Sequence, residues 1–238
     1  MDNYNIYNYE PQEAARSANA FPALMSKVYL WMTLALAITG LTAFYIAGNE
    51  SLFYGLANNR PLFWGLLIGE FAVVVLLSAR IMRMSFATAG MLFGLYAILN
   101  GVTLSFLLLI YTDESIATTF FVTAGTFGAM SLVGLFTKRD LSAIGRFLFM
   151  ALIGLIIATI VNVFVASNTL GWAITYAGVL IFCGLTAYDT QKMKQILTEC
   201  SHLGEQNLLK IALLCSLSLY LDFINLFLYL LRIFGNRR

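Results

Sequence analysis

The sequence predicts an all-α integral membrane protein of seven transmembrane helices. The chain has 238 residues, of which 60% are hydrophobic and only 11% are charged, and its mean hydropathy is +0.82. Soluble domains are near a quarter charged, so this composition is typical of a chain that lives in lipid. The apolar residues also gather in long runs close to the ~20 residues that a helix needs to cross the hydrocarbon. No segment shows the alternation of a strand.

Seven apolar segments can be marked along the chain, and short polar stretches separate them. Pro61 suits the first turn of the second helix, the acidic turn Asp113–Glu114 separates the third from the fourth, and the polar stretch 190–207 joins the last two in a hairpin. The segments are residues 24–47, 62–79, 84–111, 116–137, 147–166, 170–188 and 208–234.

Residues 1–23 are polar and mixed in charge, so we expect a flexible tail before one transmembrane domain at 24–238. Gly65-xxx-Gly69 and Gly90-xxx-Gly94 are patterns that allow close helix approach, and we interpret them as structural.

The distribution of basic residues predicts a cytoplasmic amino terminus, because positive charge gathers on cytoplasmic loops. The opposite loops hold Arg60 together with Glu50, Asp113 and Glu114. The residues on the predicted cytoplasmic side are Lys27, Arg80, Arg83, Lys138, Arg139, Arg146, Lys192 and Lys194. Seven crossings would put Arg237 and Arg238 outside, so either the last segment is re-entrant or the rule fails at the tail. We favour seven crossings.

Several function classes are disfavoured by composition. A net charge of +2 is too small to indicate a nucleic-acid partner, and the three cysteines show no CxxC spacing. His202 is the single histidine and lies in a loop, whereas an intramembrane serine protease needs a histidine within a helix. The aspartates stand in the contexts AYDTQ and YLDFI rather than in Gly-rich protease motifs. We therefore expect neither an enzyme nor a protein with an organic cofactor.

Polar residues inside the apolar segments are the candidate functional groups, because a carboxylate in the membrane is costly unless it is paired, protonated or in contact with water. Asp222 lies near the middle of the last segment. Glu70 lies midway along the second, where it either protonates and packs or lines a polar cavity. Asn100 and Asn162 are interpreted as interhelical hydrogen-bond partners, worth about 1 kcal/mol each.

Asp189 and Asp222 lie on the two arms of one predicted hairpin, 15 residues before and 18 residues after Gly204. An antiparallel hairpin that turns there brings them to similar height, although hydropathy alone puts Asp189 at the membrane edge. A long, partly exposed sixth helix or a bent seventh helix would reconcile the two views. The alternative is that Asp189 caps a helix end in water while Asp222 bonds a neighbouring helix.

If the two carboxyl groups meet, both cannot easily ionise, so they would share a proton and titrate as a unit. Such a pair would be a proton-sensitive latch, and its hard oxygen atoms suit Ca²⁺. Arg80 or Arg83, at the same membrane face, would supply a counter-charge.

At these residues the sequence resembles a known family. AYDTQKMK at 187–194 and SLSLYLDFINLFLYLLRIFG at 216–235 are similar to signature segments of the Bax inhibitor-1 family, also called the transmembrane Bax-inhibitor-motif family. NGVTLSFLLLIYT at 100–112 and the region 80–83 are similar to its middle helices. The resemblance covers the chain from the first helix to the end.

The resemblance implies seven helices, with the last one central and wrapped by the other six. The resemblance to bacterial members implies a pH-sensitive calcium leak governed by two aspartates, which match Asp189 and Asp222. An arginine associated with that pair matches Arg80 or Arg83. An acidic residue on the ion path matches Glu70. Calcium is then the permeant or bound ion, and the expected location is the bacterial inner membrane.

Two function hypotheses follow from the sequence and the resemblance. The first is a proton-gated calcium leak. The second is a non-conducting regulator that binds a membrane-bound AAA protease or another membrane protein, as the resemblance to some bacterial members implies. Nothing in the sequence sets the oligomeric state, and a monomer is compatible with it.

Overall fold

A computed structural model describes residues 9–200 and 204–238 and contains only helices and connecting loops, apart from one isolated β-bridge. His202 lies outside the described residues. The elements are α1 (Tyr9–Ala47), α2 (Glu50–Ala57), α3 (Arg60–Arg80), the 3₁₀ turn η2 (Ile81–Arg83), α4 (Phe86–Ile110), α5 (Asp113–Phe136), α6 (Ser142–Val165), α7 (Asn168–Glu199) and α8 (Glu205–Phe234). Within the described residues, seven helices are long and apolar enough to cross a membrane, so the predicted fold class is confirmed.

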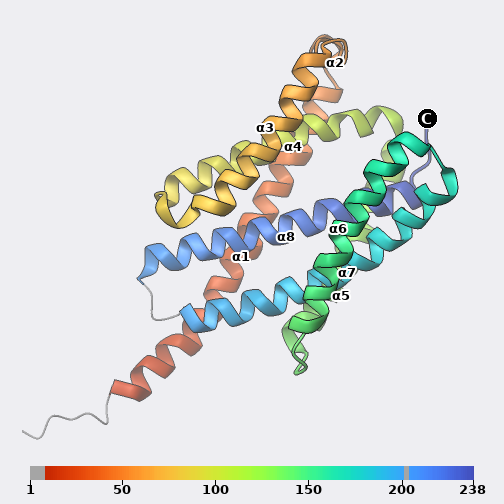
Figure 1. Cartoon of the computed structure of the whole chain (residues 1–238). Helices are drawn as coiled ribbons and strands as arrows, with labels where there is room; N and C mark the ends of the chain where they lie inside the picture. The colour runs from red at the N-terminus through yellow and green to blue at the C-terminus, as the bar shows by residue number, and fades with distance from the viewer. Residues whose placement is uncertain (1–8, 201–203) are drawn as a thin grey trace, which may run out of the picture.

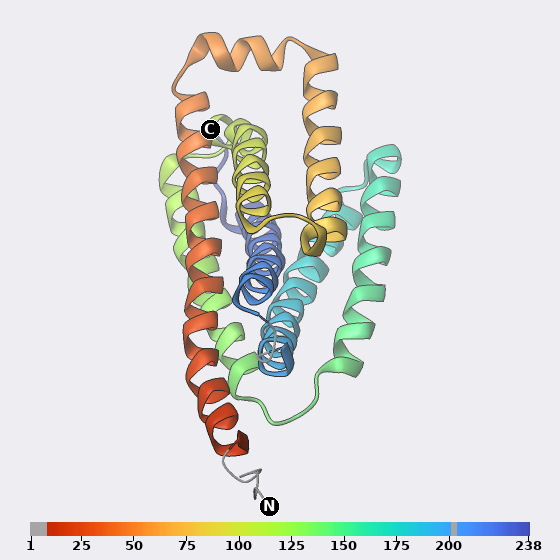
Figure 2. The same cartoon turned by 90° about the vertical axis from the view of Figure 1, so that its left-hand side faces the viewer.

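The helix α2 is the element that the sequence did not predict. It lies across the ends of α1 and α3 and buries none of its residues (Figure 2). Asn49 and Asn59 cap α2 and α3, since their Oδ1 atoms accept from Leu52 N (3.2 Å) and Leu62 N (3.1 Å). Eight residues are too few to form a transmembrane segment, so hydropathy alone assigned this stretch to a loop.

Helix α8 is the centre of the bundle. In its most apolar window 67% of residues are buried, against 6% for α3 and α6. It packs directly on α1, α4, α5 and α7, while α3 and α6 pack mainly on the outer sides of α4 and α7 (Figures 1 and 2). The last helix is therefore central as expected, with four helices in its immediate shell and two at the periphery.

The hairpin of α7 and α8 is longer than its apolar segments. Helix α7 has 32 residues and continues well past Asp189 to Glu199. At 1.5 Å per residue it is about 48 Å long, so its last turns extend beyond the hydrocarbon. This is the long sixth helix that reconciles the height of Asp189 with that of Asp222.

The chain after α8 runs back along the α4–α5 loop. Thr112 N donates to Asn236 O (3.0 Å), Arg238 N donates to Ile110 O (2.9 Å), and Arg238 Nη2 pairs with Asp113 Oδ1 at 2.6 Å. Helix α8 is continuous over 30 residues, so the re-entrant alternative is wrong. Arg238 lies on the face opposite to the basic loops with its charge partly balanced by Asp113.

The structure differs from the sequence-based expectations at the amino-terminal tail and at the Gly-xxx-Gly patterns. Helix α1 begins at Tyr9, inside the stretch expected to be a flexible tail, and residues 1–8 lie outside the described part. A Cβ on Gly65, Gly69 or Gly94 would meet open space, so these glycines do not mark close helix contacts. Close approaches lie at other glycines, among them Gly101, where α4 meets the backbone of Thr39 on α1.

Candidate functional site

Asp222 is the buried carboxyl group at the centre of the molecule. Its side chain is 5% exposed, and its Oδ2 atom has no hydrogen-bond partner among the described residues. The cause is its position on α8, which is covered on several sides, so a polar residue near its middle has no route to water along the helix surface. An unpaired polar atom in such a place costs free energy and marks a candidate functional group.

Asp189 approaches Asp222 from α7. It is half-buried, the exposed Ser218 of α8 lies close to its carboxyl group, and Lys192 lies one turn further along its own helix. The two aspartates are within electrostatic reach of one another. The structure thus places the predicted pair together, with Asp189 nearer the exterior and Asp222 deeper in the bundle.

Neither predicted arginine lies in this site. Arg80 ends α3, Arg83 ends η2, and both are exposed. Within the described part of the chain they form no ion pair, and the cation that acts on Asp189 is Lys192. Near η2, Lys210 of α8 donates to the backbone oxygen of Met82 (3.5 Å).

Glu70 forms a second polar group, between α3 and α4. Its Oε1 accepts from Asn100 Nδ2, and its Oε2 accepts from Thr103 Oγ1 at 2.9 Å. Asn100 therefore joins two helices, as expected. Asn162 does not, because its Oδ1 accepts from the nearby backbone N of Ser167 (3.1 Å) at the end of its own helix.

The Glu70 group continues to the central helix through two tyrosines. Asn100 Nδ2 donates to Tyr96 OH (3.4 Å), and the Tyr96 ring packs edge-on against Tyr220 of α8, 5.8 Å between centroids. Thr39 Oγ1 donates to Ala97 O (2.9 Å), so the 2.7 Å contact between Thr39 and Tyr220 must use the tyrosine proton.

Tyr220 is two residues from Asp222, about 200° around a helix, so the two side chains leave α8 on opposite sides. The central helix therefore carries one polar residue toward the α7 side and another toward α1 and α4. Nothing in the sequence distinguishes Tyr220 and Thr39 as functional residues, since a tyrosine or threonine in an apolar segment is not unusual.

Gln191 is a further residue that was missed, although it lies within the AYDTQKMK segment. Its Nε2 donates to Arg139 O (2.9 Å), and its Oε1 accepts from Leu141 N (2.8 Å). Both ends of this buried amide therefore hold the α5–α6 loop against α7, two residues beyond Asp189. This contact fixes the orientation of the helix that carries Asp189.

The donors at the aspartate pair are few for a resident metal ion. No cluster of three or more His, Cys, Asp or Glu side chains occurs in the described residues. Ca²⁺ takes six to eight oxygen ligands, so two carboxyl groups and the Ser218 hydroxyl would leave most of its shell to water. The arrangement suits a transient contact with a cation better than tight binding.

Comparison with known proteins identifies the group to which this architecture belongs. The family model described as "Inhibitor of apoptosis-promoting Bax1" matches residues 22–238. The "Inner membrane protein YbhL" of Escherichia coli strain K12 is 52% identical over 214 residues, which cover 90% of this chain and 92% of the relative. A protein of Deinococcus radiodurans is 44% identical over 214 residues, with 90% of each chain covered, and RP147 of Rickettsia prowazekii is 43% identical over 216 residues, with 90% and 89% covered. The chain, with seven spans of which the last is the buried central helix, therefore belongs to the Bax inhibitor family.

Proposed function

We propose that this protein is a pH-sensitive calcium leak of the inner membrane, with its amino terminus in the cytoplasm and the Asp189–Asp222 pair as its gate. The observation that carries the proposal is the unpartnered, 5% exposed carboxyl group of Asp222 within electrostatic reach of Asp189. The similarity to an inner membrane protein of Escherichia coli supports the location.

Charging both carboxyl groups of the pair at once costs free energy. Two unit charges about 5 Å apart repel by roughly 3 kcal/mol at an effective dielectric constant of 20. A term of this size shifts an equilibrium between two helix packings by about a hundredfold. Binding or loss of the shared proton is therefore sufficient to change the preferred packing of α8 against α7.

The groups around the pair indicate how protons and cations would reach it. Asp189 is half-buried and Ser218 is exposed, so the outer end of the pair faces the side of the bundle that carries the α5–α6 loop. Lys192 lies there and would oppose cation entry while stabilising an ionised Asp189. Calcium is then a permeant ion that the pair contacts transiently.

Glu70 remains a prediction for the ion path. Both of its carboxyl oxygens accept hydrogen bonds from α4, and the group lies on the other side of α8 from Asp222. A role in conduction would require the bonds from Asn100 and Thr103 to open.

The test is Ca²⁺ flux into dye-loaded liposomes between pH 5 and pH 8, with wild type beside Asp189→Asn and Asp222→Asn. Asp140→Asn is the matched control, since Asp140 is an exposed aspartate that caps Ser142 N at 2.9 Å. We expect pH-dependent flux in wild type and in the control, and loss of the pH response in both gate variants. Flux no greater than in empty vesicles at every pH would overturn the proposal.

A polar cleft of about 370 Å³ favours the second hypothesis, a non-conducting regulator of a membrane protease. The α5–α6 loop and the end of α7 form the cleft, whose charged residues are Lys138, Arg139, Asp140, Lys194 and Glu199. Such a surface would contact a soluble segment of a partner. Absence of flux, together with partner co-purification that survives Asp222→Asn, would support this function instead.

A further inference from the structure

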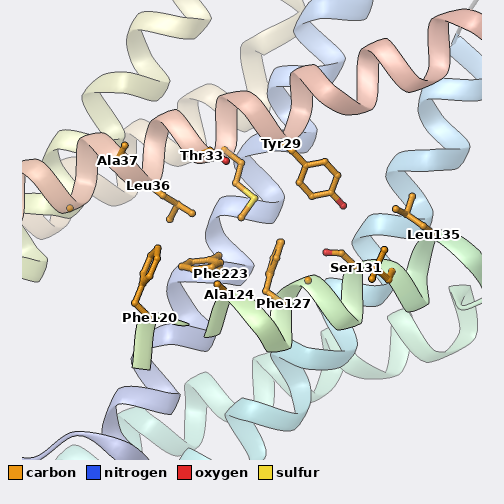
Figure 3. Close-up of a pocket in the computed structure, with 14 residues that line it drawn as sticks. Tyr29, Thr33, Leu36, Ala37, Phe120, Ala124, Phe127, Ser131, Leu135 and Phe223 are labelled. Atoms are coloured by element: carbon orange, nitrogen blue, oxygen red, sulfur yellow. The ribbon is translucent and has the colours of Figure 1, made fainter. Parts of the chain in front are cut away.

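A long apolar groove runs between α1 and α5, and the proposed gate does not use it. Its larger part has a volume of about 780 Å³, with α1 and α5 as walls and Phe223 of α8 on the floor (Figure 3). A second part of about 200 Å³ continues along the same helices and shares Leu36, Gly40 and Phe120 with the first. The larger volume lies within the roughly 300–1,000 Å³ typical of small-molecule sites.

Small residues on both helices leave the space between α1 and α5 unfilled. Ala37 and Gly40 lie on α1, and Ala124 and Gly128 lie on α5. A Cβ on either glycine would meet nothing within 4 Å, so the space beside them is not filled by other parts of the described chain. In a membrane-spanning protein this opening faces hydrocarbon, since α1 and α5 are both transmembrane helices.

The groove is polar at one end. Tyr29 of α1 and Ser131 of α5 point toward one another across it (Figure 3). This end lies toward the α5–α6 loop, because Ser131 and Leu135 belong to the last turns of α5. A ligand with an apolar body and a polar head would place its head there.

Positive charge surrounds the same end. Lys27 precedes Tyr29 by two residues, Lys138 follows Leu135 by three, and Lys194 Nζ donates to Leu135 O at 2.9 Å. At the opposite end, α5 begins with Asp113 and Glu114, and Arg238 pairs with Asp113 there. The three lysines are therefore the feature that is complementary to an anionic head group at the end with Tyr29.

We propose that the α1–α5 groove binds a phospholipid of the bilayer, with an acyl chain along Gly40 and Gly128 and an anionic head group beside Lys27, Lys138 and Lys194. The bound chain rests on Phe223, which packs edge-on against Phe120 (5.6 Å) and Phe127 (5.5 Å). The lipid thereby bridges α1, α5 and α8. The site is independent of the calcium leak.

The test compares two glycine-to-leucine substitutions on helix α5. Gly128→Leu fills the groove, whereas Gly125→Leu is the matched control, because Gly125 also has nothing within 4 Å of its Cβ but does not line the groove. Native mass spectrometry of the detergent-purified protein would measure retention of phosphatidylglycerol against phosphatidylcholine with the same acyl chains. Gly40→Leu, on the opposite wall, provides a second filled groove if Gly128→Leu does not fold.

We expect phosphatidylglycerol to be retained by wild type and Gly125→Leu and lost from a variant with a filled groove. Lys138→Gln should weaken retention by about fivefold, the effect expected for one lysine near an anionic surface. Equal retention by the filled and control variants would overturn the proposal. Equal binding of phosphatidylcholine, or displacement of the lipid by a second copy of the chain detected as a dimer, would also overturn it.

Discussion

The contact between α1 and α4 gives a quantitative test of the packing around the central helix. A Cβ on Gly101 would lie 2.6 Å from Thr39 O, 2.7 Å from Thr42 Cβ and 3.2 Å from Thr39 Cα. Ordinary contacts of a Cβ are 3.4–4 Å, so Gly101→Ala requires the helices to separate by about 0.8 Å at the oxygen alone. Thr39 cannot move away from α4 without disturbing its 2.7 Å hydrogen bond to Tyr220 OH.

Overpacking of this kind costs about 1–3 kcal/mol. Replacing glycine by alanine within a helix also stabilises the helix by up to about 1 kcal/mol, because alanine has the higher helix propensity. This gain offsets part of the cost of overpacking. Gly94→Ala on the same helix is the control, since its Cβ meets nothing within 4 Å and it reports the propensity term by itself. We therefore expect Gly101→Ala to be less stable than Gly94→Ala by about 1–3 kcal/mol.

The assay is equilibrium unfolding in mixed detergent micelles with increasing dodecyl sulfate, followed by the fluorescence of the three tryptophans. If Gly101→Ala unfolds at the same detergent fraction as Gly94→Ala, or later, the close approach of α4 to Thr39 is not a constraint and the reasoning fails.

Three other substitutions test separate features. Ala166→Gly should stabilise the protein by about 0.5–1 kcal/mol, because Ala166 ends α6 at a φ of 52°; an unchanged or lower melting temperature would contradict this. Glu70→Ala should destabilise by about 1–3 kcal/mol, since it removes the carboxyl oxygen that accepts from the buried Asn100 Nδ2, and wild-type unfolding behaviour would rule out the network. Arg238→Ala should cost less than about 1 kcal/mol, because its pair with Asp113 is exposed, and any difference that persists in high salt would show a role beyond charge.

The residues that sequence reasoning placed well are those whose position depends on the chain itself. Membrane insertion and seven spans follow from local composition, because burial in lipid requires a long apolar segment wherever the chain crosses. The shared height of Asp189 and Asp222 follows from the distance of each to Gly204, since two helices joined by a short turn must run antiparallel. Neither inference needs knowledge of how the other helices pack.

The features that sequence reasoning misplaced depend on the rotation and tilt of one helix against another. The Gly65-xxx-Gly69 pattern defines a smooth stripe on α3 but does not say whether a neighbour meets it, and none does within 4 Å of either Cβ. Arg80 and Arg83 were expected near the aspartates from their membrane height, yet both side chains are exposed at the end of α3 and in η2.

The sequence by itself therefore determined that this protein lies in lipid, how many times it crosses the membrane and that two aspartates stand at similar height on the arms of one hairpin. Only the tertiary structure decided that Tyr220 and Thr39 extend the Glu70 group to the other side of α8, and that α1 and α5 stand apart over Phe223. The physical reason is that hydropathy and helix periodicity are properties of one segment. Side-chain partners and grooves arise from the packing of several helices, and that packing is set by the shapes of all of them together.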